Sequence, residues 1–174
     1  MSERNIEVFD SVYLHKKTTP VEFPLSEEMK QVVQDLKDTL AGCERATGVA
    51  APQIGVSSSL LIYKIGDFVK PTVMINPKIV KARNMEEEGK LEMCLSYPEQ
   101  IYYVPRYKNI TVFFQDENGE SYVLKYKGFE ARVLQHEIDH LDGLTIADRG
   151  ELLDEDITRE LLGEMKDGKK EEID

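Results

Sequence analysis

The chain has 174 residues, of which 41% are hydrophobic, and a formal net charge of −11. This length favours one domain with a buried core, and no apolar run approaches the roughly 20 residues of a membrane span. The acidic balance argues against strong electrostatic binding to nucleic acid or to an anionic membrane.

The N-terminal part of the chain predicts one amphipathic helix. Residues 1–5 are polar and do not resemble a secretory signal, which favours an intracellular location. Ser26 is suited to cap a helix whose first turn holds Glu27 and Glu28, and Gly42 is suited to end it. The helix over about residues 27–41 has apolar residues at helical spacing, namely Met29, Val32, Val33, Leu36 and Leu40.

Short strands are predicted after Gly55, where apolar and β-branched residues alternate with turn residues. The sequence Asp116-Glu117-Asn118-Gly119 is turn-forming, so the last two strands are predicted to make a hairpin. The predicted strands cover residues 59–65, 72–75, 79–81, 101–104, 110–115 and 122–126.

Two further helices are predicted in the C-terminal part. Residues 129–141 predict a helix that ends at Asp142-Gly143. A third helix is indicated by Leu152, Leu153, Ile157, Leu161, Leu162 and Met165. We therefore predict an α+β fold with mostly antiparallel short sheets around a central helix, an N-terminal amphipathic helix and a C-terminal helix. Residues 1–150 would form a single catalytic domain, and residues 151–174 an acidic, partly helical extension with 10 acidic and 4 basic residues.

The central predicted helix carries a candidate metal site. The segment Gln135–His140 contains His-Glu-x-x-His, in which His136 and His140 are one helical turn apart and project from one face. Two such imidazoles can hold one metal ion, and Glu137 beside them can act as a general base. The motif indicates metal-assisted hydrolysis without specifying the bond that is broken.

A catalytic site of this kind needs a third protein ligand. Zincin-type metalloproteases take it from a residue downstream of the motif, and Glu151, Glu155 and Glu160 are available there. The other candidate is Cys94, which could equally be a small buried core residue. Cys43 and Cys94 are too few for a secreted disulfide framework, which favours a reducing compartment.

Three ordered segments resemble the motifs of the peptide deformylase family. The segment Gly48–Gly55 is similar to Gly-x-Gly-Φ-Ala-Ala-x-Gln, where Φ is aliphatic, and Glu92–Ser96 is similar to Glu-Gly-Cys-Leu-Ser. The segment Gln135–Leu141 matches the third motif, Gln-His-Glu-x-x-His. The resemblance covers roughly residues 10–150, which is nearly the whole predicted catalytic domain.

The resemblance implies one divalent metal ion per chain, held by Cys94, His136 and His140 with water in the fourth position. Two imidazoles and a thiolate suit a tetrahedral Zn²⁺ or Fe²⁺ site. We expect Fe²⁺ in the cell, and Zn²⁺, Ni²⁺ or Co²⁺ can also occupy sites of this kind.

The implied reaction removes the formyl group from the N-terminal formylmethionine of new polypeptides and releases formate. Glu137 would take the proton of the attacking water and return it to the departing amine. By resemblance, the Gln53 side-chain amide and the Leu95 backbone N–H would stabilise the oxyanion.

A methionine side chain needs an apolar slot, and Val49, Val133 and Leu134 are candidates to line it, although each could equally be an ordinary core residue. Gly48 would let the peptide backbone approach, or would simply allow a turn. Beside the site, Glu92 and Arg106 could pair and position the cysteine loop, or could be a surface pair without a role.

Two positions depart from the family pattern, because Ala46 and Met93 replace glycines of the first and second motifs. Met93 either adds bulk beside the substrate cleft or points away and packs. The departures leave open a deformylase-fold amidase with shifted acyl-amine specificity. The sequence also leaves open an endopeptidase with a downstream ligand and a non-catalytic, metal-stabilised binding protein.

The expected partners are formylated nascent polypeptides, with a possible transient association with the ribosome. The acidic tail does not favour docking on ribosomal RNA, and neither sequence-specific nucleic-acid binding nor membrane binding is expected. This activity would place the chain in the cytoplasm or in an organelle with bacterial-type translation.

Overall fold

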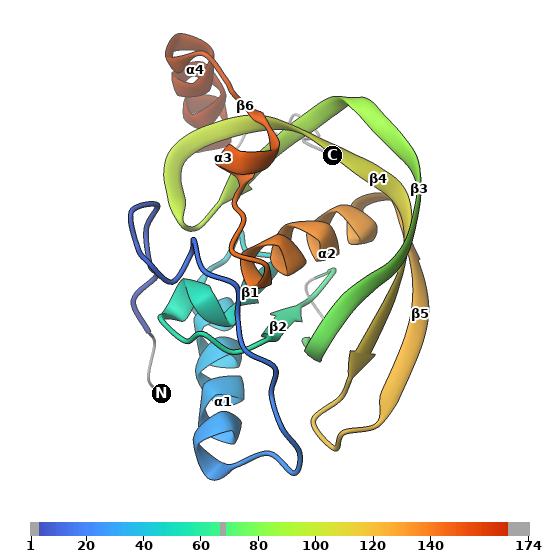
Figure 1. Ribbon diagram of the computed structural model, residues 1–174. Helices are drawn as coiled ribbons and strands as arrows, with labels where there is room; N and C mark the ends of the chain where they lie inside the picture. Colours follow the sequence, from blue (N-terminus) through green and yellow to red (C-terminus); the bar gives the residue numbers. More distant parts are fainter. Residues whose placement is uncertain (1–3, 67–68, 167–174) are drawn as a thin grey trace.

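The computed structural model describes residues 4–66 and 69–166, and Figure 1 shows a strongly bent sheet that wraps around one central helix. The fold is α+β, as the sequence predicts. In chain order the elements are α1 (Glu27–Gly42), β1 (Gly48–Ala50), a 3₁₀ helix η1 (Ala51–Ile54), β2 (Leu60–Tyr63), β3 (Thr72–Cys94), β4 (Tyr97–Gln115), β5 (Ser121–Lys127), α2 (Gly128–Leu141), α3 (Ile146–Arg149), β6 (Glu151–Leu152) and α4 (Glu155–Lys166).

The described strands form one antiparallel sheet in the order β1-β2-β3-β4-β5, with β6 paired to the other end of β4. The predicted hairpin at residues 116–119 is confirmed, since β4 and β5 pair from Gln115 and Ser121 onward. Strands β1 and β2 lie at one edge of this order and β5 at the other, so the long β3–β4 pair forms the middle of the sheet.

Strands β3 and β4 are much longer than the sequence pattern predicts. The segments 72–75 and 79–81 belong to one continuous strand, and so do 101–104 and 110–115. The β3–β4 register shifts four times, and Asn76 and Asn84 adopt positive φ angles of 51° and 59°. The register shifts break the strict alternation of inward and outward residues, which is why the sequence predicts separate short strands.

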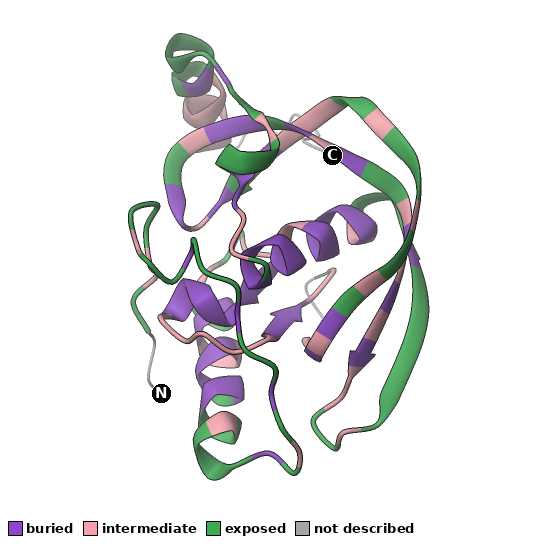
Figure 2. Cartoon of the chain, viewed as in Figure 1, coloured by how far each residue is buried: buried purple, intermediate pink, exposed green. Residues whose placement is uncertain are grey.

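The two main helices enclose the core. Helix α1 begins as predicted, with the Ser26 side chain accepting a hydrogen bond from the Met29 backbone N–H, and it buries Val32 and Leu36. Helix α2 is buried along most of its length on the concave side of the sheet (Figure 2). One apolar cluster fills the space between α1 and strands β1–β2, and a second lies between α2 and the sheet. The central helix therefore has little freedom to move its polar side chains.

The C-terminal part differs in detail from the prediction. The third helix begins at Glu155, because Leu152 lies in β6 and the Leu153 backbone N–H donates to the Ile101 carbonyl. The short helix α3 was not predicted from the sequence. Residues 167–174 of the predicted acidic extension lie outside the described residues, and the division at residue 150 stays a prediction.

Within residues 4–66 and 69–166, the structure contains no helix that combines the length and apolar character needed to cross a membrane.

Candidate metal centre and active site

Cys94, His136 and His140 converge at one point, although the cysteine and the first histidine are 42 positions apart in the sequence. Cys94 is the last residue of β3, and both histidines project from α2, which the sheet encloses. One ligand atom from each of the three residues lies within 4.8 Å of the others. Among the described residues, this is the one group of acidic, histidine or cysteine side chains able to hold a metal ion, and it contains no downstream glutamate.

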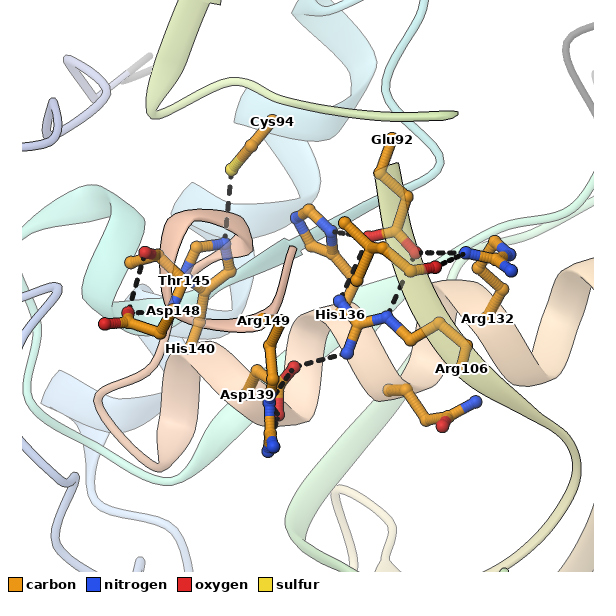
Figure 3. Close-up of polar contacts among 12 residues, drawn as sticks. Glu92, Cys94, Arg106, Arg132, His136, Asp139, His140, Thr145, Asp148 and Arg149 are labelled. Atoms are coloured by element: carbon orange, nitrogen blue, oxygen red, sulfur yellow. Dashed lines mark hydrogen bonds and ion pairs between the residues drawn. The ribbon is translucent and has the colours of Figure 1, made fainter. Parts of the chain in front are cut away.

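A carboxylate orients one of the two imidazoles, whereas Nδ1 of His140 is buried without a partner among the described residues. The Cys94 Sγ atom lies 3.3 Å from His140 Nε2. The His136 Nδ1 atom lies 3.0 Å from Glu92 Oε2, which leaves Nε2 of that ring available as a ligand (Figure 3). A carboxylate on the far nitrogen fixes the tautomer and orientation of a ligating histidine, and this is the usual arrangement in metal sites.

The electrostatics of the cluster favour the ligating form of the cysteine. Burial alone would raise the pKa of the Cys94 thiol, but the charges of His140 and His136 hold it well below its ordinary value. Burial opposes protonation of His136 as well, yet the neighbouring Cys94 raises the pKa of His136 well above its ordinary value. The thiolate is the form that binds metal. A buried thiolate and two imidazoles therefore fit a divalent transition metal.

Glu137 lies against Gly48, and the two residues are packed closely together. A Cβ atom added at Gly48 would lie 2.5 Å from Glu137 Oε1 and 2.8 Å from its Cδ and Cγ atoms. Glu137 is 4% exposed, and its Oε2 atom has no hydrogen-bond partner among the described residues. Burial raises the pKa of this carboxyl to about 7, against the opposing charges of His136 and His140. Such a group can exchange a proton near neutral pH.

Gln53 is fixed with its amide nitrogen toward the cluster. Its Oε1 atom accepts a hydrogen bond from the Ala50 backbone N–H at 3.0 Å. Its Nε2 atom donates to Ser96 Oγ at 3.2 Å and lies 3.6 Å from Cys94 Sγ. The first motif therefore reaches the site through η1, because this short helix places Gln53 beside the end of β3.

A buried network of ion pairs contacts the cluster through Glu92 and His136. The Arg106 guanidinium donates two hydrogen bonds of 3.0 Å to Glu92, which confirms the pair suggested by the sequence, and it also pairs with Asp139. Arg132 Nη1 donates to Glu92 Oε1 at 2.7 Å, and Arg149 pairs with Asp139. Burial disfavours the carboxylate of Glu92, but hydrogen bonds from His136 and Arg106 hold its pKa well below its ordinary value.

Sequence reasoning missed Arg132, Asp139 and Arg149. Arg132 lies one helical turn before His136, among apolar residues of α2. A lone charge on a buried helix face indicates a buried partner, and this was the signal that the sequence offered.

A cleft with a volume of about 460 Å³ opens beside the cluster. It is lined by Arg45, Ala46, Thr47, Gly48, Gln53, Leu91, Glu92, Met93, Cys94, Leu95, Tyr97, Pro98, Glu99, Phe129, Arg132, Val133, His136, Glu137 and Met165. Met93 is 40% exposed here, so it does not pack away into the core. Both departures from the expected glycine pattern, Ala46 and Met93, therefore lie in the wall of the cleft.

Two residues predicted to line an apolar slot do not line this cleft. Val49 is fully buried in the cluster between α1 and β1–β2, and Leu134 is fully buried between α2 and the sheet. Val49 alternates with Gly48 along β1, so its side chain lies on the opposite face of that strand. Leu134 is the next residue after Val133 on α2, so its side chain is rotated by about 100° around the helix axis relative to that of Val133.

A family model described as polypeptide deformylase matches residues 3–156 of the chain. The chain belongs to this family. A curated relative, peptide deformylase 2 of Clostridium acetobutylicum, is 38% identical over 149 residues, which cover 85% of this chain and 95% of the relative. The downstream-ligand endopeptidase is therefore not supported, and the chain is an enzyme of the deformylase family.

Solved structures of deformylases have the same fold. The crystal structure of the Thermotoga maritima peptide deformylase matches with a TM-score of 0.78 and 34% identity, covering 86% of this chain and 98% of that one. The Legionella pneumophila enzyme matches with a TM-score of 0.79 and 32% identity, covering 98% and 100%. The Acinetobacter baumannii deformylase, with Met-Ala-Ser bound, matches with a TM-score of 0.78 and 26% identity, covering 85% and 98%.

Proposed function

We propose that the chain removes the formyl group from the N-terminal formylmethionine of newly made polypeptides and releases formate. The observation that carries this proposal is the position of Glu137, which lines one cleft together with Cys94 and His136. A metal site, a buried carboxyl group and an apolar cleft are the three parts that hydrolysis of a formyl amide needs.

Cys94, His136 and His140 would hold one divalent ion, for which we propose Fe²⁺ in the cell, with Zn²⁺, Ni²⁺ or Co²⁺ able to replace it. When bound, such an ion lowers the pKa of a coordinated water and polarises a carbonyl oxygen. The Glu92 carboxylate, itself fixed by Arg106, holds His136 in the orientation that this binding requires.

In this mechanism Glu137 moves the proton. Its unpartnered Oε2 accepts the proton of the attacking water, and the same oxygen delivers it to the amine as the C–N bond breaks. Gly48 has no side chain, and this leaves the space that the Glu137 carboxyl occupies.

Charge develops on the formyl oxygen during attack, and two donors are proposed to stabilise it. One is Nε2 of Gln53, because its Oε1 is fixed by the Ala50 backbone N–H. The other is the backbone N–H of Leu95, which follows Cys94 and lines the cleft. The Gln53 amide is held in place in advance, and one of its N–H groups would turn from Ser96 or Cys94 to the oxyanion.

The substrate is proposed to lie in the cleft with its side chain against Val133 and its backbone beside Gly48, while Met93 contacts the entering peptide. The Met-Ala-Ser tripeptide bound to the A. baumannii relative supports a peptide of this kind. Because Met93 and Ala46 narrow a wall where the family resemblance implies glycine, a shifted acyl-amine preference is the second candidate function.

The proposed partners are formylated nascent chains, reached through transient association with the ribosome. We place the activity in the cytoplasm or in an organelle with bacterial-type translation, because formylated polypeptides are made there.

The test is a formate-release assay under anaerobic conditions with Fe²⁺-, Zn²⁺-, Ni²⁺- and Co²⁺-loaded protein. The substrates are formyl-Met-Ala-Ser, acetyl-Met-Ala-Ser and formyl-Ala-Ala-Ser at equal concentrations. The proposal predicts the highest kcat/KM on formyl-Met-Ala-Ser. Faster cleavage of the acetylated peptide would establish the shifted acyl preference instead, and cleavage of casein without formate release would contradict both functions.

A further inference from the structure

The outward face of the β3–β4–β5 sheet carries a surface that the proposed deformylation does not use. Ile110, Val112 and Phe114 of β4 belong to the core against α2, so the alternate residues of that strand point to the opposite side. We name this surface the outer sheet face. It comprises Tyr107, Asn109, Thr111 and Phe113 on β4, Lys78, Lys81 and Arg83 on β3, and Lys125 and Lys127 on β5.

The strand register places the cations in rows. Lys81 pairs with Thr111, which pairs with Lys125. In the next row, Arg83 pairs with Asn109, which pairs with Lys127. In these rows, the neutral residues Thr111 and Asn109 of the central strand are thus flanked on both sides by positive charge, whereas Lys108 of that strand forms an ion pair with Glu86. Along each outer strand the two cations are two residues apart, about 6.7 Å, which is close to the spacing of neighbouring phosphates on a nucleic-acid strand.

This concentration of positive charge is exceptional for the chain. Of its 22 basic and 33 acidic residues, the segments 78–85, 107–115 and 121–127 hold six basic and no acidic ones. The remainder therefore holds 16 basic and 33 acidic residues. Within the described part of the chain, Lys81, Arg83, Lys125 and Lys127 form no ion pair. The net charge of −11 therefore does not describe this surface, where a charged partner would encounter a local positive potential.

The same face is hollowed rather than flat. A depression with a volume of about 600 Å³ is lined by all four of these cations, by Asn84, Asn109 and Thr111, and also by the core residues Ile110 and Tyr126. Glu130 is the one acidic residue among the described residues that line it, and its carboxylate accepts a hydrogen bond from the buried Tyr63 hydroxyl. No lining residue is shared with the catalytic cleft.

We propose that the outer sheet face binds single-stranded RNA. The cations of β3 and β5 contact phosphates, and Tyr107, which is 36% exposed on the central strand, stacks on a base. Asn109 and Thr111 lie between the two lines of cations, where they can hydrogen-bond base edges or 2′-hydroxyls.

The exposed ring favours RNA over other polyanions. An acidic peptide or an anionic membrane would use the cations but has no flat base to stack on Tyr107. Duplex nucleic acid keeps its bases stacked inside, so a ring at the centre of a sheet has nothing to contact. The choice of RNA over single-stranded DNA rests on the proposed function, because formylated chains are made on the ribosome, which contains RNA.

The test measures fluorescence anisotropy of labelled U12 RNA with the full-length protein at several salt concentrations. Four phosphate contacts predict a slope of log K against log salt of about −3, so affinity should fall about 50-fold between 50 and 200 mM salt. The double variant K125E/K127E should weaken binding at least about tenfold and reduce the slope to about −1.4. Tyr107→Ala should weaken binding without changing the slope, and Tyr107→Phe should restore it.

The matched control is K16E/K30E, which makes the same change of net charge at exposed positions in the N-terminal segment and in α1. It should bind U12 like the unmodified protein. Equal weakening by this control, or the absence of U12 binding at 50 mM salt, would overturn the proposal. Equal or tighter binding of dT12, polyglutamate or phosphatidylglycerol vesicles would overturn the assignment to RNA.

RNA binding and deformylation are measured separately, so one can fail without the other. K125E/K127E should release formate from formyl-Met-Ala-Ser at the unmodified rate, because neither lysine lines the catalytic cleft. If the proposed deformylation fails, U12 binding still tests the surface itself.

Discussion

Replacing Gly48 by alanine perturbs the proposed base without touching it directly. The new Cβ would lie 2.5 Å from Glu137 Oε1 and 2.8 Å from Cδ and Cγ. Non-bonded atoms at their optimal separation are roughly 3.5–4.0 Å apart, so the carboxyl must move by about 1 Å. The Glu137 side chain projects from α2 and is buried against β1, and the hydrogen bonds of the helix and of the sheet hold the backbone of both elements in place. We therefore expect the side chain to move and the fold to persist.

A displacement of about 1 Å at a catalytic group costs on the order of 100-fold in rate, which corresponds to about 2.7 kcal/mol in the activation free energy. We expect Gly48→Ala to lower kcat for formate release by that factor. The metal content should stay at one equivalent, because the atoms nearest to the new Cβ all belong to Glu137, which is not one of the three proposed ligands.

Gly163→Ala is the matched control, because a Cβ at Gly163 in α4 meets no atom within 4 Å. Formate release gives kcat and KM, elemental analysis gives metal content, and urea unfolding gives stability for both variants. A Gly48→Ala enzyme with unchanged kcat and a raised KM would refute the reasoning. That result would mean that Gly48 only allows the peptide backbone to approach, and that the Glu137 side chain can tolerate a neighbouring Cβ atom.

The remaining predictions concern the metal, the ion network and pH. Elemental analysis should show that Cys94→Ala no longer binds one equivalent of metal, whereas Cys43→Ala does. Tight metal binding by Cys94→Ala would mean that the third ligand is another residue. Arg106→Met should destabilise the protein by about 3 kcal/mol in urea unfolding, because it removes the buried guanidinium that Glu92 and Asp139 share and leaves each carboxylate with one arginine, Arg132 or Arg149. A change below about 1 kcal/mol would show that the network is dispensable. The pKa of Glu137 is about 7 without metal, and a bound cation lowers it. Since the base must be deprotonated, kcat/KM of metal-loaded enzyme should rise with pH along an acid limb centred below 7, and a rate that falls over that range would contradict the assignment.

The histidine pair of the candidate metal site could be predicted from the sequence because its spacing is local. His136 and His140 are fixed by helix geometry, and helix α2 forms where the sequence predicts it. Cys94 could not be assigned from spacing alone, since only the fold shows that β3 ends beside α2. At that point the resemblance to a known family carried information that residue patterns did not.

The long strands and the cleft wall could not be predicted for a physical reason. Register shifts in β3, the first of them at Asn76, break the two-residue period on which strand prediction depends. Val133 and Leu134 are adjacent apolar residues of one helix, yet only the first lines the cleft. Which neighbour faces the site is decided by how α2 packs against the sheet.

The distribution of charge on the surface is also difficult to predict from the sequence. The expectation against strong nucleic-acid binding rests on the net negative charge of the chain, and it stays a prediction. The sheet register aligns Lys81 with Lys125 and Arg83 with Lys127 from segments more than 40 residues apart. A sum over the chain cannot report a field that only strand pairing creates.

The most direct test of the account is formate release by Glu137→Ala, measured on protein with verified metal content. The variant should bind one equivalent of metal, because Glu137 is not among the three clustered ligands. Its kcat/KM on formyl-Met-Ala-Ser should fall by about 10²–10⁴-fold, the usual contribution of a general acid–base. Turnover close to that of the unmodified protein, with metal bound, would contradict the claim that Glu137 moves the proton in this site.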